Sequence, residues 1–351
     1  MNIVFFGSGH YAPIVLRSIV KDQTLKIPLV VTGDLIKKGP AQLTASLSRE
    51  NKLPLFSWTN TEQNIELINK IKSLGPDFLV VADFGHRKKP IPAELLALPR
   101  FGAVNIHPSL LPKYRGTTPV QTAIINGDRQ TGVSLILMDD KFDHGPLIAQ
   151  TTLPLGPTAT SPKLYEKLFE LGARMLPSAL RHCEAASGGR GNHTKNRSLD
   201  GVYTESDECA RDDRRDPSAA FGTDLLIRIA SDALAMTGRV KFYSPPKAQD
   251  ETKATYTKML KKETGRIDWT KSPLEIERMI RAYSGWPGSW TTLAELCSAH
   301  NSKFLIPNSK SKRVKIVKAH LSESNQLVID QLQIEGKKPI SWEEFGRGYL
   351  K

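Results

Sequence analysis

The first 150 residues alternate short apolar runs with segments in which apolar residues recur at helical spacing. The apolar runs predict strands at Asn2–Phe6, Ile27–Val31, Phe78–Ala82, Ala103–Ile106 and Ser134–Met138. Helices are expected at Ala12–Val20, Thr61–Leu74, Pro119–Asn126 and, after a proline-rich break, Ser161–Leu180. Alternation of this kind is typical of a parallel α/β sheet with helices on its faces. We therefore expect an α/β domain over residues 1–182.

The pattern changes between residues 183 and 239, where the chain is polar, glycine-bearing and dense in charge. Such a composition buries too little apolar surface to fold alone, so we expect a flexible linker or insertion there, with a helical pattern only at Phe221–Met236. In residues 240–351 a helix is expected at Pro273–Tyr283. Strands are expected at Phe304–Ile306, Val314–Ala319, Leu327–Leu332 and Ile340–Trp342. Short, closely spaced strands favour a small β-barrel, although a β-domain without a binding role would show the same pattern.

The distribution of charged residues suggests a class of binding partner. The chain carries a net charge of +13, of which residues 253–351 contribute 18 Lys and Arg against 10 Asp and Glu. Residues 156–252 are balanced, with 14 of each sign. A basic excess gathered in the presumed β-barrel favours an anionic partner, nucleic acid first, over a merely soluble basic surface.

Composition also bounds the class of protein. No apolar run reaches the roughly 18 residues that a membrane span needs, and the N-terminal run reads as a strand rather than a signal peptide. Three scattered cysteines, Cys183, Cys209 and Cys297, do not form a disulfide framework, so we expect a reducing cytoplasm. We also expect a monomer. His182, Cys183 and His193 lack the spacing of a metal site, and no metal is expected.

Three polar residues carry the candidate chemistry. Asn105 and His107 alternate along one predicted strand and therefore project from the same face, and Asp143 follows the next apolar run. An amide donor, an imidazole and a carboxylate at one sheet edge suit acyl transfer, as oxyanion donor, proton shuttle and orienting partner. Taken singly, each has a structural explanation: a strand-end hydrogen bond, a core histidine or a turn cap.

The wider sequence around these residues resembles a known family. The run Asn105–Gly116, with Pro119 and Asp143-His144-Gly145 beyond it, is similar to the folate-dependent formyltransferases. Its longer form, Ser109–Gly116, is most similar to members that formylate methionyl-tRNA. Further similar stretches are Asp250–Tyr256, Gly265–Trp269, Trp286–Trp290 and Glu335–Ser341, so the resemblance covers residues 1–182 and 240–351.

The resemblance implies a Rossmann-like formyltransferase domain followed by an OB-like β-barrel. It implies 10-formyltetrahydrofolate as the formyl donor, methionyl initiator tRNA as the acceptor, and Asn105, His107 and Asp143 as catalytic residues. The expected substrate-binding residues are Ser109, Leu110, Leu111, Pro112, Lys113, Arg115, Gly116, Phe84, Gly85 and Met138. The expected tRNA-binding residues are Lys37, Lys38, Arg313, Lys315, Lys337 and Lys338.

Two other functions remain open at this stage. A formyltransferase for another amine, such as a sugar nucleotide, would need the same three residues. A nicotinamide-dependent dehydrogenase is suggested by Gly7-Ser8-Gly9-His10-Tyr11-Ala12 after the first strand, with Asp34 where a ribose-binding acid would lie. That motif is short and leaves the run 105–143 and the C-terminal motifs unexplained. Tight packing of the strand on the helix at Gly7 and Gly9 is enough to explain it.

Overall fold

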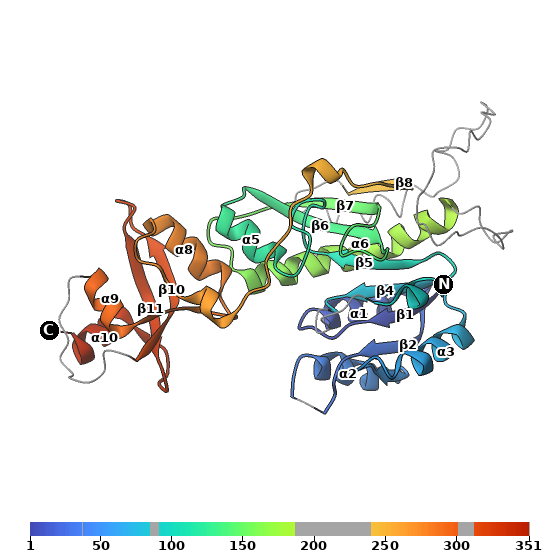
Figure 1. The fold of residues 1–351 in the computed structure, drawn as a ribbon, viewed down its shortest axis with the longest axis horizontal. Coiled ribbons are helices and arrows are strands. Elements are labelled where there is room, and N and C mark those ends of the chain that lie inside the picture. Colours follow the sequence, from blue (N-terminus) through green and yellow to red (C-terminus); the bar gives the residue numbers. More distant parts are fainter. Residues whose placement is uncertain (37, 85–90, 187–239, 301–311, 351) are drawn as a thin grey trace. The chain divides into compact units, whose positions relative to one another are not determined.

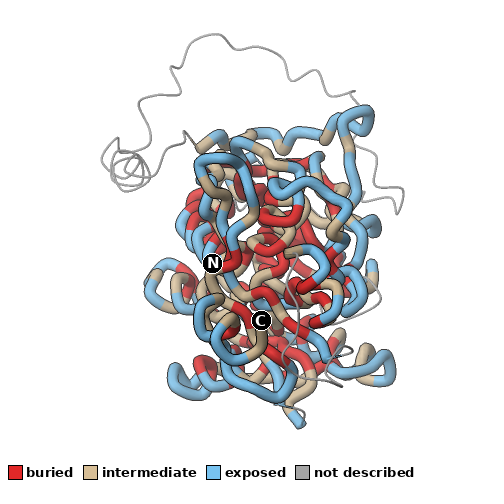
Figure 2. The backbone as a smooth tube through the Cα atoms, turned by 90° about the vertical axis from the view of Figure 1, so that its left-hand side faces the viewer, coloured by how far each residue is buried: buried red, intermediate tan, exposed pale blue. Residues whose placement is uncertain are grey.

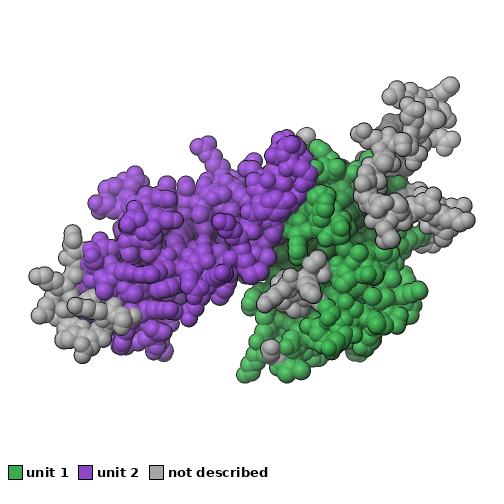
Figure 3. Space-filling view, in the orientation of Figure 1, with its two compact units in different colours: residues 1–107, 133–153, 169–249 green, residues 108–132, 154–168, 250–351 purple. Residues whose placement is uncertain are grey.

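The computed structural model describes residues 1–36, 38–84, 91–186, 240–300 and 312–350. The chain divides into two compact units, which Figure 3 distinguishes by colour. Unit 1 comprises residues 1–107, 133–153 and 169–249, and unit 2 comprises residues 108–132, 154–168 and 250–351. The helix expected at Phe221–Met236 and the strand expected at Phe304–Ile306 lie outside the described residues. In the part that the structure describes, no helix is both long and apolar enough to span a bilayer.

The larger sheet lies mainly in unit 1 and has the described strand order β3-β2-β1-β4-β5-β6-β7-β8 (Figure 1). Its strands are β1 (Asn2–Phe6), β2 (Lys26–Thr32), β3 (Leu55–Ser57), β4 (Phe78–Ala82), β5 (Ala103–His107), β6 (Gln130–Leu137), β7 (Leu147–Pro154) and β8 (Lys241–Lys247). The pairings among β1 to β5 are parallel, which confirms the α/β expectation. The β5–β6 and β7–β8 pairings are antiparallel, so the sheet is mixed rather than wholly parallel as expected. The sequence did not reveal this, because an apolar run predicts a buried strand but not its direction.

Helices accompany this sheet along the chain. They are α1 (Ala12–Lys21), α2 (Ala41–Glu50), α3 (Asn64–Leu74), α4 (Ala93–Leu96), α5 (Pro119–Asn126) and α6 (Ser161–Ala186). Helix α2 was not expected from the sequence. Its buried positions are largely small residues such as Ala41, Thr44, Ala45 and Ser48, so it lacks the row of large apolar residues that identifies an amphipathic helix.

The core of unit 1 forms where the central strands meet α3 and the loops that follow the strands. Val4, Leu29 and Leu79 come from neighbouring strands and are fully buried together with Leu67 of α3. Figure 2 shows the buried residues mainly in the interior and the exposed residues mainly on the outer turns. The continuous apolar character of β4, which is buried at all five positions, is what made this strand predictable.

Unit 2 contains a smaller antiparallel sheet in the order β12-β11-β10-β9 within the described residues. Its strands are β9 (Ser289–Thr292), β10 (Arg313–Leu321), β11 (Leu327–Ile334) and β12 (Ile340–Ser341), and its helices after α5 are α8 (Pro273–Ala282), α9 (Leu293–Ala299) and α10 (Trp342–Tyr349). Ser272 and Glu275 form a capping box that starts α8. The sheet and helices share one apolar core, as an OB-like domain would.

Candidate active site

The three candidate residues meet within unit 1, at the end of β5. Asn105 Nδ2 donates to Asp143 Oδ1 over 3.3 Å, and His107 Nδ1 lies 3.5 Å from the same oxygen. His107 is the last residue of β5 and is 4% exposed, while the Asp143 side chain is 13% exposed. The two-residue periodicity of a strand therefore directs the amide and the imidazole toward one carboxylate. In this largely buried place a charge interacts more strongly than in water.

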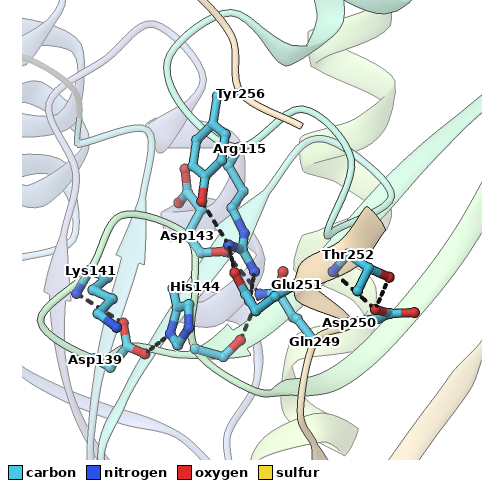
Figure 4. A network of polar contacts seen from close by, with 11 residues as sticks. Arg115, Asp139, Lys141, Asp143, His144, Gln249, Asp250, Glu251, Thr252 and Tyr256 are labelled. Carbon is cyan, nitrogen blue, oxygen red and sulfur yellow. Dashed lines mark hydrogen bonds and ion pairs between the residues drawn. The ribbon is translucent and has the colours of Figure 1, made fainter. Parts of the chain in front are cut away.

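Asp143 reaches this position from the loop that joins β6 to β7. Its backbone has φ +51°, a left-handed conformation that aspartate tolerates better than most residues. Two residues later, a Cβ on Gly145 would lie 1.7 Å from the carbonyl oxygen of Leu137, so only glycine fits there. The Asp139 carboxylate makes two further contacts within this loop (Figure 4). It accepts from the Lys141 amide over 3.0 Å, and its other oxygen lies 2.5 Å from His144 Nδ1.

Gln249 also contacts this loop, and the sequence reasoning missed it. Its side-chain amide donates to the carbonyl oxygens of Asp143 and Gly145 from 106 and 104 residues away along the chain. The Asp139–His144 pair was missed as well. No local pattern in the sequence marks either contact.

The loop that follows β5 belongs to unit 2 and is held by one hydrogen bond within itself and by contacts with the segment after residue 254. Ser109 is fully buried and donates through Oγ to the Lys113 carbonyl over 2.7 Å. The Arg115 amide donates to the Thr255 carbonyl and the Arg115 carbonyl accepts from the Thr257 amide, both over 2.8 Å. Gly116 has φ +106°, and a Cβ there would lie 2.8 Å from Thr257 Oγ1. The segment after residue 254 thus fixes the conformation of this loop.

The Arg115 side chain is placed differently from the expectation that it would meet an anionic substrate. It is 1% exposed, and its guanidinium donates to both carboxylate oxygens of Glu251 over 2.6 and 2.9 Å. It also donates to the Tyr256 hydroxyl over 3.1 Å. The hydrogen bond to Glu251 raises the pKa of Arg115 above its ordinary value, so the pair stays charged. This geometry favours a role in holding the loop (Figure 4).

Replacing Glu251 with glutamine should destabilise unit 2. The change leaves a buried guanidinium without its carboxylate, and because the Glu251 side chain is 53% exposed we expect a loss of only about 2 kcal/mol in the free energy of unfolding. Urea unfolding of the full chain measures it, with Glu323→Gln in the exposed β10–β11 turn as the matched control. Equal stability of E251Q and E323Q would contradict the structural role of this pair.

Part of this loop lines a cavity of about 310 Å³ in unit 2. Its walls include Leu110, Lys113, Tyr114 and Arg129. The Tyr114 hydroxyl donates to Asp128 over 2.8 Å, which orients the ring in the wall. Lys113 is exposed, in keeping with the expectation that it could meet an anionic substrate.

The other expected substrate-binding residues are spread over unit 1 and unit 2. Phe84 stacks on Trp58 with ring centroids 6.0 Å apart, and Met138 packs against the core of unit 1. Leu111 is buried and Pro112 is half-buried in unit 2, joined by a cis peptide bond. Gly85 lies outside the described residues.

The expected tRNA-binding residues are exposed or half-buried where they are described. Arg313 lies over the Trp290 ring at 4.5 Å, and Lys337 lies over the Tyr349 ring at 5.2 Å. Lys38 and Lys338 are exposed and Lys315 is half-buried, whereas Lys37 lies outside the described residues. These cation–ring contacts restrict the orientation of two of the basic side chains.

The backbone amides of the glycine motif after β1 already donate hydrogen bonds to another residue of the chain, Asp83. The amides of Ser8 and Gly9 donate to the Asp83 carbonyl over 3.2 and 2.7 Å, and the Tyr11 amide donates to the Asp83 carboxylate over 2.8 Å. Burial raises the pKa of this carboxyl, while the Tyr11 amide opposes the shift. A dinucleotide pyrophosphate would need these same donors at the start of α1. Asp34 is also engaged, because it accepts from the Ile36 amide in a turn.

The described residues hold no group of three or more ligand side chains that could bind a metal. His182, one of the residues considered for that role, stacks on Phe242 and approaches the Ser178 carbonyl through Nδ1 at 2.8 Å. Burial raises the pKa of Cys183 to about 12, so this thiol stays protonated and is a poor ligand.

Comparisons with known proteins show the family of this chain. The family described as formyl transferase matches residues 1–180, and the family described as formyl transferase, C-terminal domain, matches residues 259–350. The methionyl-tRNA formyltransferase of Methylacidiphilum infernorum is 30% identical over 365 residues, covering 99% of this chain and 95% of the relative. That of Roseiflexus castenholzii is 33% identical over 297 residues, covering 83% and 76%.

One solved structure extends the likeness to the fold of nearly the whole chain. HypX from Aquifex aeolicus in complex with tetrahydrofolic acid has a TM-score of 0.54 and 15% identity, covering 99% of this chain and 47% of HypX. At this identity the likeness shows the fold alone.

Proposed function

Because the chain belongs to the formyl transferase family, we propose that it transfers a formyl group from 10-formyltetrahydrofolate to the amino group of methionyl initiator tRNA. The observation that carries this proposal is the meeting of Asn105 and His107 on one oxygen of Asp143. Full-length similarity to methionyl-tRNA formyltransferases supports the choice of acceptor, and the occupied glycine motif disfavours a dinucleotide enzyme. The proposed enzyme works as a cytoplasmic monomer without a metal.

The residues at the end of β5 would perform this transfer without a covalent enzyme intermediate. The α-amine attacks the formyl carbon, and negative charge develops on the formyl oxygen. One N–H of the Asn105 amide donates to Asp143. The second N–H, together with the His107 ring, would donate to the negatively charged formyl oxygen. His107 takes the proton lost by the amine, Asp143 stabilises the charged ring, and the ring passes the proton to the folate nitrogen as its bond to the formyl carbon breaks. The products are formylmethionyl-tRNA and tetrahydrofolate.

The acceptor would be held by basic groups outside the reacting centre. We assign this role to Lys37, Lys38, Arg313, Lys315, Lys337 and Lys338, with Lys113 of the loop after β5 nearer the charged end of the tRNA. The excess of positive charge in residues 253–351 supports the assignment. The domain boundaries that we propose are 1–182 for catalysis, 183–239 for a linker and 240–351 for tRNA binding.

A parallel assay of acceptors tests the proposed function. Purified full chain is given 10-formyltetrahydrofolate with methionyl initiator tRNA, with methionine alone, or with an amino-sugar nucleotide. We expect product only on the charged tRNA, and a KM for tRNA that rises steeply with salt because phosphate contacts release counterions. If only the amino-sugar nucleotide is formylated, the proposed catalytic residues stand, but the acceptor is a sugar nucleotide rather than tRNA. Failure to consume the folate with any acceptor would overturn the proposal.

A further inference from the structure

Gln249 lies in the segment between the two family matches, which end at residue 180 and begin again at residue 259. Its position follows from the pairing of β8 with β7. Leu147 pairs with Lys247 in an antiparallel register, so the residue two beyond Lys247 comes beside the residue two before Leu147. That register places Gln249 beside Gly145, in the loop that carries Asp143.

The amide of Gln249 makes two hydrogen bonds to this loop. Nε2 donates to the Asp143 carbonyl over 2.9 Å and to the Gly145 carbonyl over 2.7 Å. Both acceptors lie outside the regular strand ladder, where a backbone carbonyl needs a donor from elsewhere. One side-chain amide, with two N–H groups on one nitrogen, therefore closes the turn around His144 (Figure 4).

The turn needs such support because its conformation is unfavourable in isolation. Asp143 has φ +51°, and a single carboxylate oxygen of this residue serves both Asn105 and His107. A small rotation of the turn would move that oxygen away from one partner or both. The side chain that fixes the two carbonyls thus fixes where the carboxylate points.

We propose that Gln249 is a positioning residue for the formyl transfer, acting by locking the Asp143 turn in the geometry that serves Asn105 and His107. This role rests on the proposed function of those three residues. Glutamine suits it because a glutamate of the same length would set a carboxylate against two carbonyl oxygens. An asparagine would be one methylene too short to keep both bonds.

The competing explanation is that Gln249 only stabilises the end of the β7–β8 pair. The two explanations differ in what Gln249→Glu should change. A stabilising residue would lower the melting temperature and leave the catalysis of the folded enzyme intact. A positioning residue would lower kcat in enzyme that remains folded, with little change in the KM of either substrate.

The test compares Gln249→Glu, Gln249→Asn and the matched control Gln63→Glu in the full chain. Gln63 also donates through Nε2 to a carbonyl, that of Ser57, but at the β3 edge of the sheet. We expect Q249E to lower kcat about 10- to 100-fold, Q249N to fall between it and the unchanged enzyme, and Q63E to keep its kcat. The melting temperature of each variant is measured alongside.

A second readout needs no substrate and separates this inference from the proposed function. The nitrogen chemical shifts of the His107 ring report the nearby carboxylate, so Q249E and Q249N should move them and Q63E should not. Unchanged His107 shifts in both Gln249 variants, or an unchanged kcat in folded Q249E, would overturn the positioning role. If the unchanged enzyme transfers no formyl group, the proposed function fails, and the shifts still decide whether Gln249 sets the geometry of the turn.

Discussion

Replacing His107 with alanine should lower kcat for formyl transfer by about 10³-fold, with the KM of each substrate changed by less than about threefold. The imidazole is 4% exposed, and its Nδ1 faces the Asp143 carboxylate at 3.5 Å. Nε2, on the opposite side of the ring, is then directed away from that carboxylate and would exchange protons with the reacting amine and the folate nitrogen. Alanine removes both the donor and the proton shuttle but leaves the binding surfaces of the two substrates in place.

His107→Asn separates the two tasks of the ring. Asparagine retains an N–H donor near the strand end but cannot carry a proton at neutral pH. If proton transfer dominates, H107N should be nearly as slow as H107A. If hydrogen bonding to the developing oxyanion dominates, H107N should recover part of the lost kcat. Steady-state kinetics against both substrates measures this, and a variant with normal kcat and a raised KM would mean that His107 only binds substrate.

The shared direction of Asn105 and His107 could be predicted from the sequence because the two residues lie on the same strand. Asn105 and His107 are two residues apart on a strand whose bounds were expected almost to the residue, so their shared direction follows from strand periodicity alone. Helix α5 was expected with the correct bounds for a similar reason, since Pro119 starts it and Gly127 ends it in a left-handed conformation.

Contacts between distant segments were not predictable in this way. The pairing of Arg115 with Glu251 joins residues 136 apart, and no pattern in either segment indicates the other. Arg115 was therefore expected to meet a substrate, as a basic residue in a loop often does. Strand β8 was missed because Lys241–Lys247 contains two prolines and is mostly exposed, so it forms only by pairing with β7 at the edge of the sheet.

The glycine motif shows how a local pattern can also mislead. Gly7 and Gly9 match the pattern of a phosphate-binding turn, although the rest of the sequence already favoured close packing of the strand on the helix. The structure favours close packing, because a Cβ on Gly9 would lie 2.1 Å from the Asp83 carboxyl. Asp83 follows a different strand, so the residue that occupies the motif was not visible from the motif itself.

Replacing Asp143 with asparagine should lower kcat by about 10²- to 10³-fold without unfolding the turn. Asparagine tolerates the left-handed backbone at residue 143 and has nearly the shape of aspartate. It removes the negative charge beside the His107 ring, however, and it replaces one carboxylate oxygen with an NH2 group that can only donate. The KM of each substrate should stay within about threefold, and a raised KM at normal kcat would assign Asp143 to binding instead.

The double variant His107→Ala with Asp143→Asn tests whether the contributions of the two residues to kcat depend on each other. Because both act on the same protons, their effects should not add, and the double variant should be about as slow as the slower single variant. Independent roles would instead multiply the two losses, giving about 10⁵-fold or more if each single change costs the expected amount. The shared Oδ1 of Asp143, within 3.5 Å of both the amide and the imidazole, is the structural reason to expect coupling.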